Sequence, residues 1–248
     1  MQGIGRRSMA IRINNVYLIA YIITLTSRPP LPTMTAMSND NVNLWGTAAH
    51  ALQYLGQADS IPHRSEGEAE LLDWLPTASA RVLDLGSGDG RLLTLIKLAR
   101  PAAEAVAIDF SDTMLAKLRE RFGCDSSVAI IRHDLDHPLP SSLGTFDTIV
   151  SSFAIHHLPH ARKRSLYEEV YGLLRPGGIF CNLEHVASPT DALHERFLAC
   201  LEVAPRDEDP SNKLLDVETQ LAWLREIGFV DVDCHWKWRE LALLAGGR

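Results

Sequence analysis

The segment at residues 81–92, Arg-Val-Leu-Asp-Leu-Gly-Ser-Gly-Asp-Gly-Arg-Leu, constrains the fold of this chain more than any other. An apolar run there ends in an acid, Asp84, and glycines follow at alternate positions, Gly86, Gly88 and Gly90. The next apolar run, residues 105–108, is closed by Asp109. A strand, a glycine turn and a helix, with an acid after the second strand, are typical of a βαβ unit that binds a nucleoside.

Short apolar strands alternate with helices after residue 80. We expect strands at 81–85, 105–109, 128–132, 146–151 and 179–184, and helices at 90–99, 111–122, 162–174 and 217–227. Two last strands, 230–238 and 240–245, have almost no connection, so they must pair antiparallel. The pattern predicts an α/β fold, a doubly wound sheet with helices on both faces.

Two helices are expected before this alternation. One covers residues 43–55, and a second runs to Leu75 from an N-cap at Ser65, with Glu68 completing a capping box. Residues 190–212 form a polar insertion that interrupts the regular pattern. We therefore expect one domain at 38–248, with N-terminal cap helices at 38–77 and a substrate-side insertion at 190–212.

Residues 1–37 differ in composition from the rest. Three arginines precede a short apolar run, 16–25, and a proline-rich stretch follows it. The run is about half of the ~20 residues that a membrane-spanning helix needs. We interpret this segment as a disordered leader or a gene-boundary artefact, with a targeting signal or a membrane-associated segment as the alternatives.

Charge and cysteine content limit the partners. The net charge of −7 predicts repulsion from nucleic acid and from anionic membranes. The four cysteines are widely spaced and form no C-x-x-C pair, so neither a zinc site nor a disulfide framework is supported. Reduced thiols favour a cytoplasmic protein.

The glycine turn differs from a dinucleotide-binding fingerprint. That fingerprint needs a third glycine where Arg91 stands, so a pyrophosphate site is disfavoured, although a dehydrogenase stays open as a minor alternative. The acid two residues before the turn favours a ligand that carries an amino acid and a nucleoside. Asp109, 25 residues after Asp84, stands near the offset at which an acid meets a ribose.

Five ordered motifs resemble those of the class I S-adenosylmethionine (SAM)-dependent methyltransferases, in their type 11/12-like, small-molecule branch. They are residues 82–90, Val106–Asp109, Arg132–Leu135, Phe146–Leu158 and Leu173–Gly178. The resemblance implies a Rossmann-like seven-stranded sheet of order 3-2-1-4-5-7-6 with strand 7 antiparallel. It implies SAM as the cofactor, bound by Asp84, Gly86, Ser87, Gly88, Gly90, Asp109, Phe110, Asp134, Leu135, Ser151, Ser152 and Phe153.

Candidate catalytic residues lie at the predicted ends of strands. His156 follows the fourth strand, and Glu184 and His185 end the fifth; each is a candidate base, or a group that anchors local backbone. Trp45, His50 and Tyr54 of the first helix are candidate substrate contacts. Arg64 is either a contact for the cofactor carboxylate or a solvated surface residue. No metal site is expected.

The expected activity is methyl transfer from SAM to a small-molecule acceptor, at oxygen by family frequency. The alternatives are an RNA, tRNA or protein methyltransferase and a catalytically silent SAM-binding protein. We expect no nucleic-acid or membrane partner, and either a monomer or a homodimer.

Overall fold

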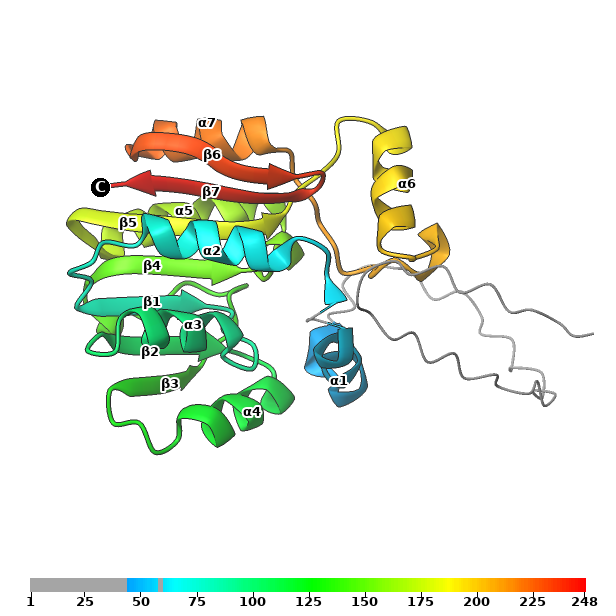
Figure 1. Cartoon of the computed structure of the whole chain (residues 1–248). Coiled ribbons are helices and arrows are strands. Elements are labelled where there is room, and N and C mark those ends of the chain that lie inside the picture. The colour runs from blue at the N-terminus through cyan, green and yellow to red at the C-terminus, as the bar shows by residue number, and fades with distance from the viewer. Residues whose placement is uncertain (1–43, 58–59) are drawn as a thin grey trace, which may run out of the picture. The chain divides into compact units, whose positions relative to one another are not determined.

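The computed structural model describes residues 44–57 and 60–248. Our interpretation of residues 1–37 lies outside the described residues. All the described residues belong to one compact unit, residues 40–248. Its helices are α1 (Ala48–Gln57), α2 (Arg64–Trp74), α3 (Arg91–Ala99), α4 (Asp112–Phe122), α5 (His160–Leu173), α6 (Asp191–Cys200) and α7 (Val217–Ile227) (Figure 1).

Seven strands form one sheet in the order β3-β2-β1-β4-β5-β7-β6. The strands β1 to β5 are parallel neighbours, whereas β7 is antiparallel to both β5 and β6. This confirms the predicted fold class and strand order. The strands are β1 (Arg81–Leu85), β2 (Glu104–Asp109), β3 (Val128–Arg132), β4 (Phe146–Ser152), β5 (Leu174–His185), β6 (Val230–Trp238) and β7 (Leu241–Gly247).

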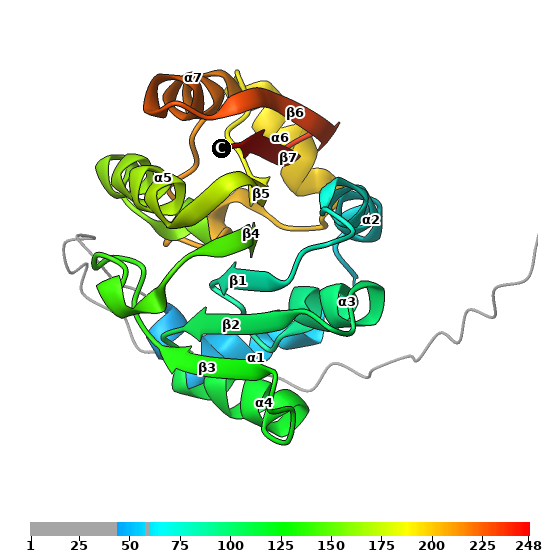
Figure 2. The same cartoon turned by 90° about the vertical axis from the view of Figure 1, so that its left-hand side faces the viewer.

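Helices cover both faces of the sheet. Figure 2 shows α5 and α7 on one side and α2 and α3 on the other. The first pair buries Leu166 and Leu224 in the largest apolar cluster, together with residues of the central strands. Leu71 of α2 and Ile96 of α3 belong to a second cluster, and α3 and α4 share a third. Burial on both faces explains why the strands have nearly continuous apolar sequences.

Several predicted element boundaries were wrong. Helix α2 begins at Arg64, not after Ser65, and its N-cap is His63, whose side chain makes no capping bond. Glu68 does not complete a capping box, because its carboxylate pairs with arginines inside the protein. Strand β5 begins at Leu174 rather than Ile179, with a register shift opposite β4.

Two segments outside the alternating core lie beyond the carboxyl ends of the parallel strands. They are α1 and the insertion that contains α6, both at the right of Figure 1. Helix α1 contacts α4. Thr190 caps α6 by accepting a hydrogen bond from the Leu193 amide at 3.3 Å. Ligand sites of open α/β sheets lie at this end of the strands, so both segments border the expected crevice.

Within residues 44–57 and 60–248, no helix combines the length and apolar character needed to cross a membrane. In the same part of the chain, no three His, Cys, Asp or Glu side chains are grouped to hold a metal ion.

Candidate cofactor and acceptor site

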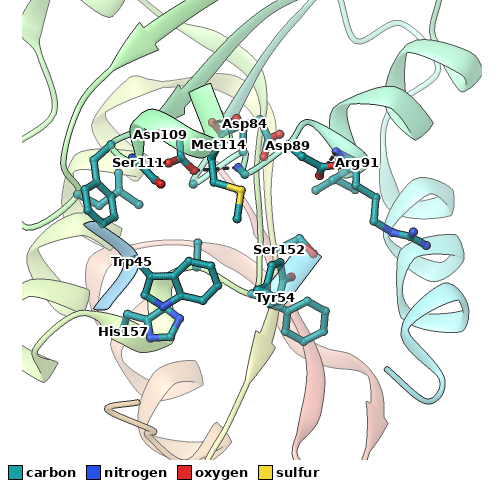
Figure 3. A pocket seen from close by; sticks show the side chains of 18 of the residues that line it. Trp45, Tyr54, Asp84, Asp89, Arg91, Asp109, Ser111, Met114, Ser152 and His157 are labelled. Atoms are coloured by element: carbon teal, nitrogen blue, oxygen red, sulfur yellow. Dashed lines mark hydrogen bonds between the residues drawn. The ribbon is translucent and has the colours of Figure 1, made fainter. Parts of the chain in front are cut away.

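A pocket of about 320 Å³ lies beyond the carboxyl ends of β1, β2 and β4 (Figure 3). It is lined by residues from the 3-10 turn Leu44–Gly46, helices α1 to α3, the glycine turn, both ends of α4, and the loops after β2, β3 and β4. These residues are Trp45, Tyr54, Leu55, Arg64, Asp84, Gly86, Ser87, Gly88, Asp89, Arg91, Leu92, Asp109, Phe110, Ser111, Met114, Arg121, His133, Asp134, Leu135, Asp136, Ser152, Phe153, Ala154, His157 and Leu158.

The glycine turn brings main chain to the pocket wall. Gly86 has a φ of +68°, and a Cβ there would lie 2.3 Å from the Cβ of Ala154. Gly88 has a φ of +57° and open space where a Cβ would be, so a ligand can approach its backbone. Gly90 lies behind the turn, where a Cβ would meet Leu118 and Phe122 of α4. The first two glycines thus shape the pocket, and Gly90 allows α3 to pack against α4.

Asp84 is a buried acid on the pocket wall. Its side chain is 1% exposed, and Oδ2 has no hydrogen-bond partner among the described residues. The pKa of Asp84 is raised to about 7, mainly by burial; the Ser87 side chain opposes this rise, and the nearby Asp109 and Asp89 carboxylates add smaller upward contributions. A cationic group in the pocket would satisfy the bare oxygen and favour its ionised form.

Asp109 is anchored by two backbone amides. Its Oδ2 accepts from the Gly88 N–H at 2.9 Å, and its Oδ1 accepts from the Ser111 N–H at 2.8 Å. Burial raises the pKa of Asp109, while these amide contacts act in the opposite direction. The carboxylate therefore fixes the glycine turn and the start of α4, and its remaining lone pairs face the pocket.

Two arginines share one buried carboxylate beside Asp84. Glu68, 2% exposed, accepts from Nε of Arg64 at 2.9 Å and from Nε of Arg91 at 2.7 Å. Arg64 also donates to the hydroxyl of Tyr54 at 3.0 Å, which links α2 to α1. The guanidinium groups of Arg64 and Arg91 therefore converge on one carboxylate at the pocket wall.

The loop after β3 lines the far end of the pocket. Leu135 of this loop and Phe110, which directly follows β2, supply apolar surface, and Asp134 accepts a hydrogen bond from the Asp136 amide at 3.0 Å. His133 also lines this end. An apolar wall with an acid at its rim suits a planar base that carries an amino group.

Aromatic residues close the opposite side of the pocket. The rings of Trp45 and His157 are 5.1 Å apart, and those of Trp45 and Tyr54 are 5.0 Å apart. Figure 3 shows Trp45 and His157 together, across the pocket from Asp84 and Asp109. Ser152, whose hydroxyl is buried without a partner among the described residues, lies on the same side. Phe153 adopts a φ of +53°, a strained conformation for this residue type.

Six of the residues singled out from the sequence do not line the pocket: Gly90, Ser151, His50, His156, Glu184 and His185. The Ser151 hydroxyl donates to the Leu85 carbonyl at 2.9 Å, between β4 and β1. Nε2 of His50 pairs with Asp209 at 3.1 Å.

His156 and Glu184 form a buried pair behind the pocket wall, with His156 Nδ1 2.6 Å from Glu184 Oε1. Burial lowers the pKa of His156, with the charges of His185 and Lys163 adding to the effect, and burial raises the pKa of Glu184. His185 is bonded to Glu240 at 2.9 Å. The structure therefore places these three candidate bases in hydrogen bonds with neighbours rather than on the pocket surface.

Sequence reasoning assigned no role to several lining residues, among them Asp89, Arg91, Ser111, Met114, Arg121 and Leu158. Asp89 lies within the glycine motif and Arg91 directly follows it, so their positions in the sequence could have identified both as pocket residues. His157 adjoins the candidate base His156, and nothing in the sequence shows which of two adjacent histidines faces the ligand. That choice depends on the short 3-10 turn Ile155–His157.

The residues of this pocket fit SAM. The unpartnered Asp84 oxygen can accept a hydrogen bond from an ammonium group, and the guanidinium groups of Arg64 and Arg91, which also line the pocket, can donate to a carboxylate. The open space at Gly88 and the lone pairs of Asp109 suit a ribose. Together they match the amino acid and the nucleoside that the glycine turn predicts.

Several known proteins with similar sequences are methyltransferases. The family model described as "Methyltransferase domain" matches residues 82–178. A demethylmenaquinone methyltransferase of Clavibacter sepedonicus is 31% identical over 173 residues, 64% of this chain and 69% of the relative. The ubiquinone/menaquinone biosynthesis C-methyltransferase UbiE of Roseobacter denitrificans is 28% identical over 203 residues, 73% of this chain and 77% of that protein.

A solved structure shows the same fold. Human N-acetylserotonin methyltransferase in complex with SAM superimposes with a TM-score of 0.60 at 16% identity, over 83% of this chain and 57% of that chain. This likeness and the sheet order show the fold, and the family model and the sequence relatives identify the chain as an enzyme that uses SAM as its cofactor. The chain belongs to the class I SAM-dependent methyltransferases.

Proposed function

We propose that this enzyme transfers the methyl group of SAM to a hydroxyl oxygen of a small, largely aromatic acceptor. The observation that carries the proposal is the aromatic wall of Trp45, Tyr54 and His157 opposite the cofactor residues. The pocket volume of about 320 Å³ is at the lower end of the range for small-molecule sites. A net charge of −7 does not favour a nucleic-acid substrate.

The chain's own residues would bind the cofactor and the acceptor, orient them toward each other and exclude water. SAM supplies an activated methyl group with a neutral thioether as the leaving group. Asp84 and the Arg64–Glu68–Arg91 cluster would hold the amino-acid end, and Asp109, Phe110 and Asp134 the nucleoside. Trp45 and Tyr54 would press the acceptor toward Ser152 and Phe153. Positioning of this kind contributes up to about 7–11 kcal/mol to lowering a barrier.

A second candidate is methyl transfer to a ring carbon of a quinone precursor. It is favoured by the names of the sequence relatives, a demethylmenaquinone methyltransferase and a quinone-biosynthesis C-methyltransferase. The same aromatic wall would hold a hydroxylated ring in either reaction. The two proposals differ only in the atom of the ring system that receives the methyl group.

The test uses SAM with an isotope-labelled methyl carbon and a metabolite extract. We expect label in the small-molecule fraction, with the methyl carbon resonance of a methoxy group. A ring-methyl resonance would support the second candidate. Label found only in RNA or protein would contradict both.

A further inference from the structure

His157 is bonded in a way that defines which of its nitrogens carries hydrogen. The Ser211 hydroxyl lies 2.7 Å from Oδ1 of Asp209 and 3.0 Å from Nδ1 of His157. A carboxylate only accepts hydrogen bonds, so the hydroxyl hydrogen goes to Asp209, and the Ser211 oxygen can then only accept. Nδ1 of His157 must therefore be the protonated nitrogen, and Nε2 has a free lone pair.

The imidazole that carries this lone pair lines the pocket, and Nε2 itself has almost no exposed surface. Nε2 of His157 is buried and has no hydrogen-bond partner among the described residues, although the ring lines the pocket beside Trp45 (Figure 3). A buried polar atom without a partner is costly, and a ligand that donates a hydrogen bond would remove this cost. The acceptor hydroxyl of the proposed reaction is such a donor.

The surroundings keep the imidazole neutral. Burial lowers the pKa of His157 well below the usual value, and the adjacent His156, whose ring is 3.9 Å away, lowers it further. The Asp209 carboxylate acts in the opposite direction, and Lys163 of α5 adds to the lowering. Lys213 also faces this residue, through a bond to its carbonyl oxygen at 2.9 Å. A neutral imidazole can accept a proton at neutral pH.

We propose that Nε2 of His157 is the base that receives the proton of the acceptor hydroxyl, and that Ser211 and Asp209 are positioning residues. The O–H bond breaks as Nε2 takes the proton, and the oxygen forms a bond to the methyl carbon. The carbon–sulfur bond breaks with its electron pair going to sulfur, which gives S-adenosylhomocysteine (SAH). The proton then leaves His157 for solvent. The inference rests on the proposed function.

The first test concerns the tautomer and needs no acceptor. A long-range proton–nitrogen correlation spectrum of protein with labelled histidines, compared with His157→Gln to assign the signal, should show His157 protonated at Nδ1. Ser211→Ala should shift the population toward the Nε2–H form, because the bond that selects Nδ1 is lost. Protonation of His157 at Nε2 in the unsubstituted protein would overturn the inference.

The second test concerns the reaction. His157→Gln should lower kcat for the labelled acceptor by about 100-fold or more, with SAH affinity changed less than about threefold. Its residual rate should rise with pH, as ionised acceptor becomes available. The control is His235→Gln on β6, outside the pocket lining, which should behave as the unsubstituted enzyme.

Different results would contradict the proposed function and the proposed role of His157. No labelled small molecule with the unsubstituted enzyme would overturn the proposed function, and the tautomer spectrum would still decide the state of His157. An active unsubstituted enzyme with an equally active His157→Gln would overturn the role of His157 alone.

Discussion

At the scale of single residues, the cofactor site depends on carboxylates that face both protein and ligand. Asp109 accepts hydrogen bonds from Gly88 and Ser111 and keeps lone pairs for a ribose. Asp109→Ala should weaken SAM and SAH binding at least tenfold, about 1.4 kcal/mol, because it removes charge-assisted bonds. Isothermal titration calorimetry with SAH measures the change.

The matched control for Asp109 is Asp112→Ala, three residues further on. Asp112 is exposed and, within residues 44–57 and 60–248, pairs with the exposed Arg132 at 3.0 Å. Its substitution should leave the affinity unchanged. Unchanged affinity in Asp109→Ala would remove the proposed ribose contact.

The sequence was most informative for residues in short motifs. Of the twelve residues predicted to bind the cofactor, the structure places ten along the pocket, and Gly90 and Ser151 directly behind it. The backbone of the glycine turn and the ends of the strands place these residues, so the spacing of the motifs in the sequence is enough to predict their positions. Trp45 and Arg64 reach the pocket only because α1 and α2 pack over the strand ends. The sequence near a residue does not reveal tertiary contacts of that kind.

At the scale of elements, α2 packs against the sheet through Gly67. A Cβ there would lie 2.8 Å from both Leu183 and Trp236. Gly67→Ala should therefore destabilise the protein by about 1–3 kcal/mol, because side chains or the helix must move. Urea denaturation followed by circular dichroism measures the loss.

Gly172 of α5 is the matched control for Gly67, because no atom lies within 4 Å of the position of its Cβ. Gly172→Ala should be neutral or stabilising by up to about 1 kcal/mol, as helix propensity predicts. Equal effects of the two substitutions would contradict the close packing of α2. The sequence predicted helix α2 but not its first residue. The predicted start relied on Glu68 as part of a capping box, whereas Glu68 pairs with two arginines in the structure.

The insertion is fastened to the sheet through one buried acid, Glu240, which has no exposed surface. Its carboxylate binds His185 of β5 at 2.9 Å, His194 of α6 at 3.0 Å, and the hydroxyl of Ser188. Glu240→Ala should cost about 3 kcal/mol, as removal of one member of a buried pair does. Amide hydrogen exchange should accelerate across residues 188–200, whereas the exposed Glu226→Ala should not change it.

This attachment depends on pH. Burial opposes protonation of His194, but its bonds to Glu240 and Glu208 outweigh it and raise the pKa above 6.5, so its contribution is lost as pH rises through the raised value. Burial also opposes ionisation of Glu240, yet its hydrogen bonds lower the pKa below 4.5, so its contribution is lost as pH falls through the lowered value. Amide hydrogen exchange in α6 should be slowest at pH values between the pKa of Glu240 and the pKa of His194. A rate independent of pH, after correction for intrinsic exchange, would contradict the attachment.

At the scale of the whole molecule, the sheet was predictable because each strand and helix carries its own periodic pattern. The alternation of elements leaves few possible topologies, and the short connection between β6 and β7 requires the antiparallel pair. The acceptor side was not predictable in the same way. Its residues come from α1, the loop after β4 and the insertion, and their arrangement depends on tertiary contacts such as Ser211 with His157.

The same fold carries an energetic cost at its cofactor site. Burial raises the pKa of Asp84 from 3.8 to about 7, so the folded protein holds this proton more tightly than the unfolded chain does. The stability of the free protein should therefore fall as pH rises from 3.8 toward 7 and stay low above it. SAH should reverse the effect, because we propose that its ammonium group pairs with the ionised carboxylate.

Thermal denaturation of Asp84→Asn tests this trade between stability and binding. At about pH 8 the variant should melt at a higher temperature than the unsubstituted protein, since no buried charge remains. SAH at about 100 times its Kd should stabilise the unsubstituted protein by about 2.7 kcal/mol, several degrees in Tm, and the variant hardly at all. Asp73→Asn, at an exposed site on α2, should change neither value. A variant that melts no higher, yet still gains stability from SAH, would mean that Asp84 stays in water and does not meet the ammonium group.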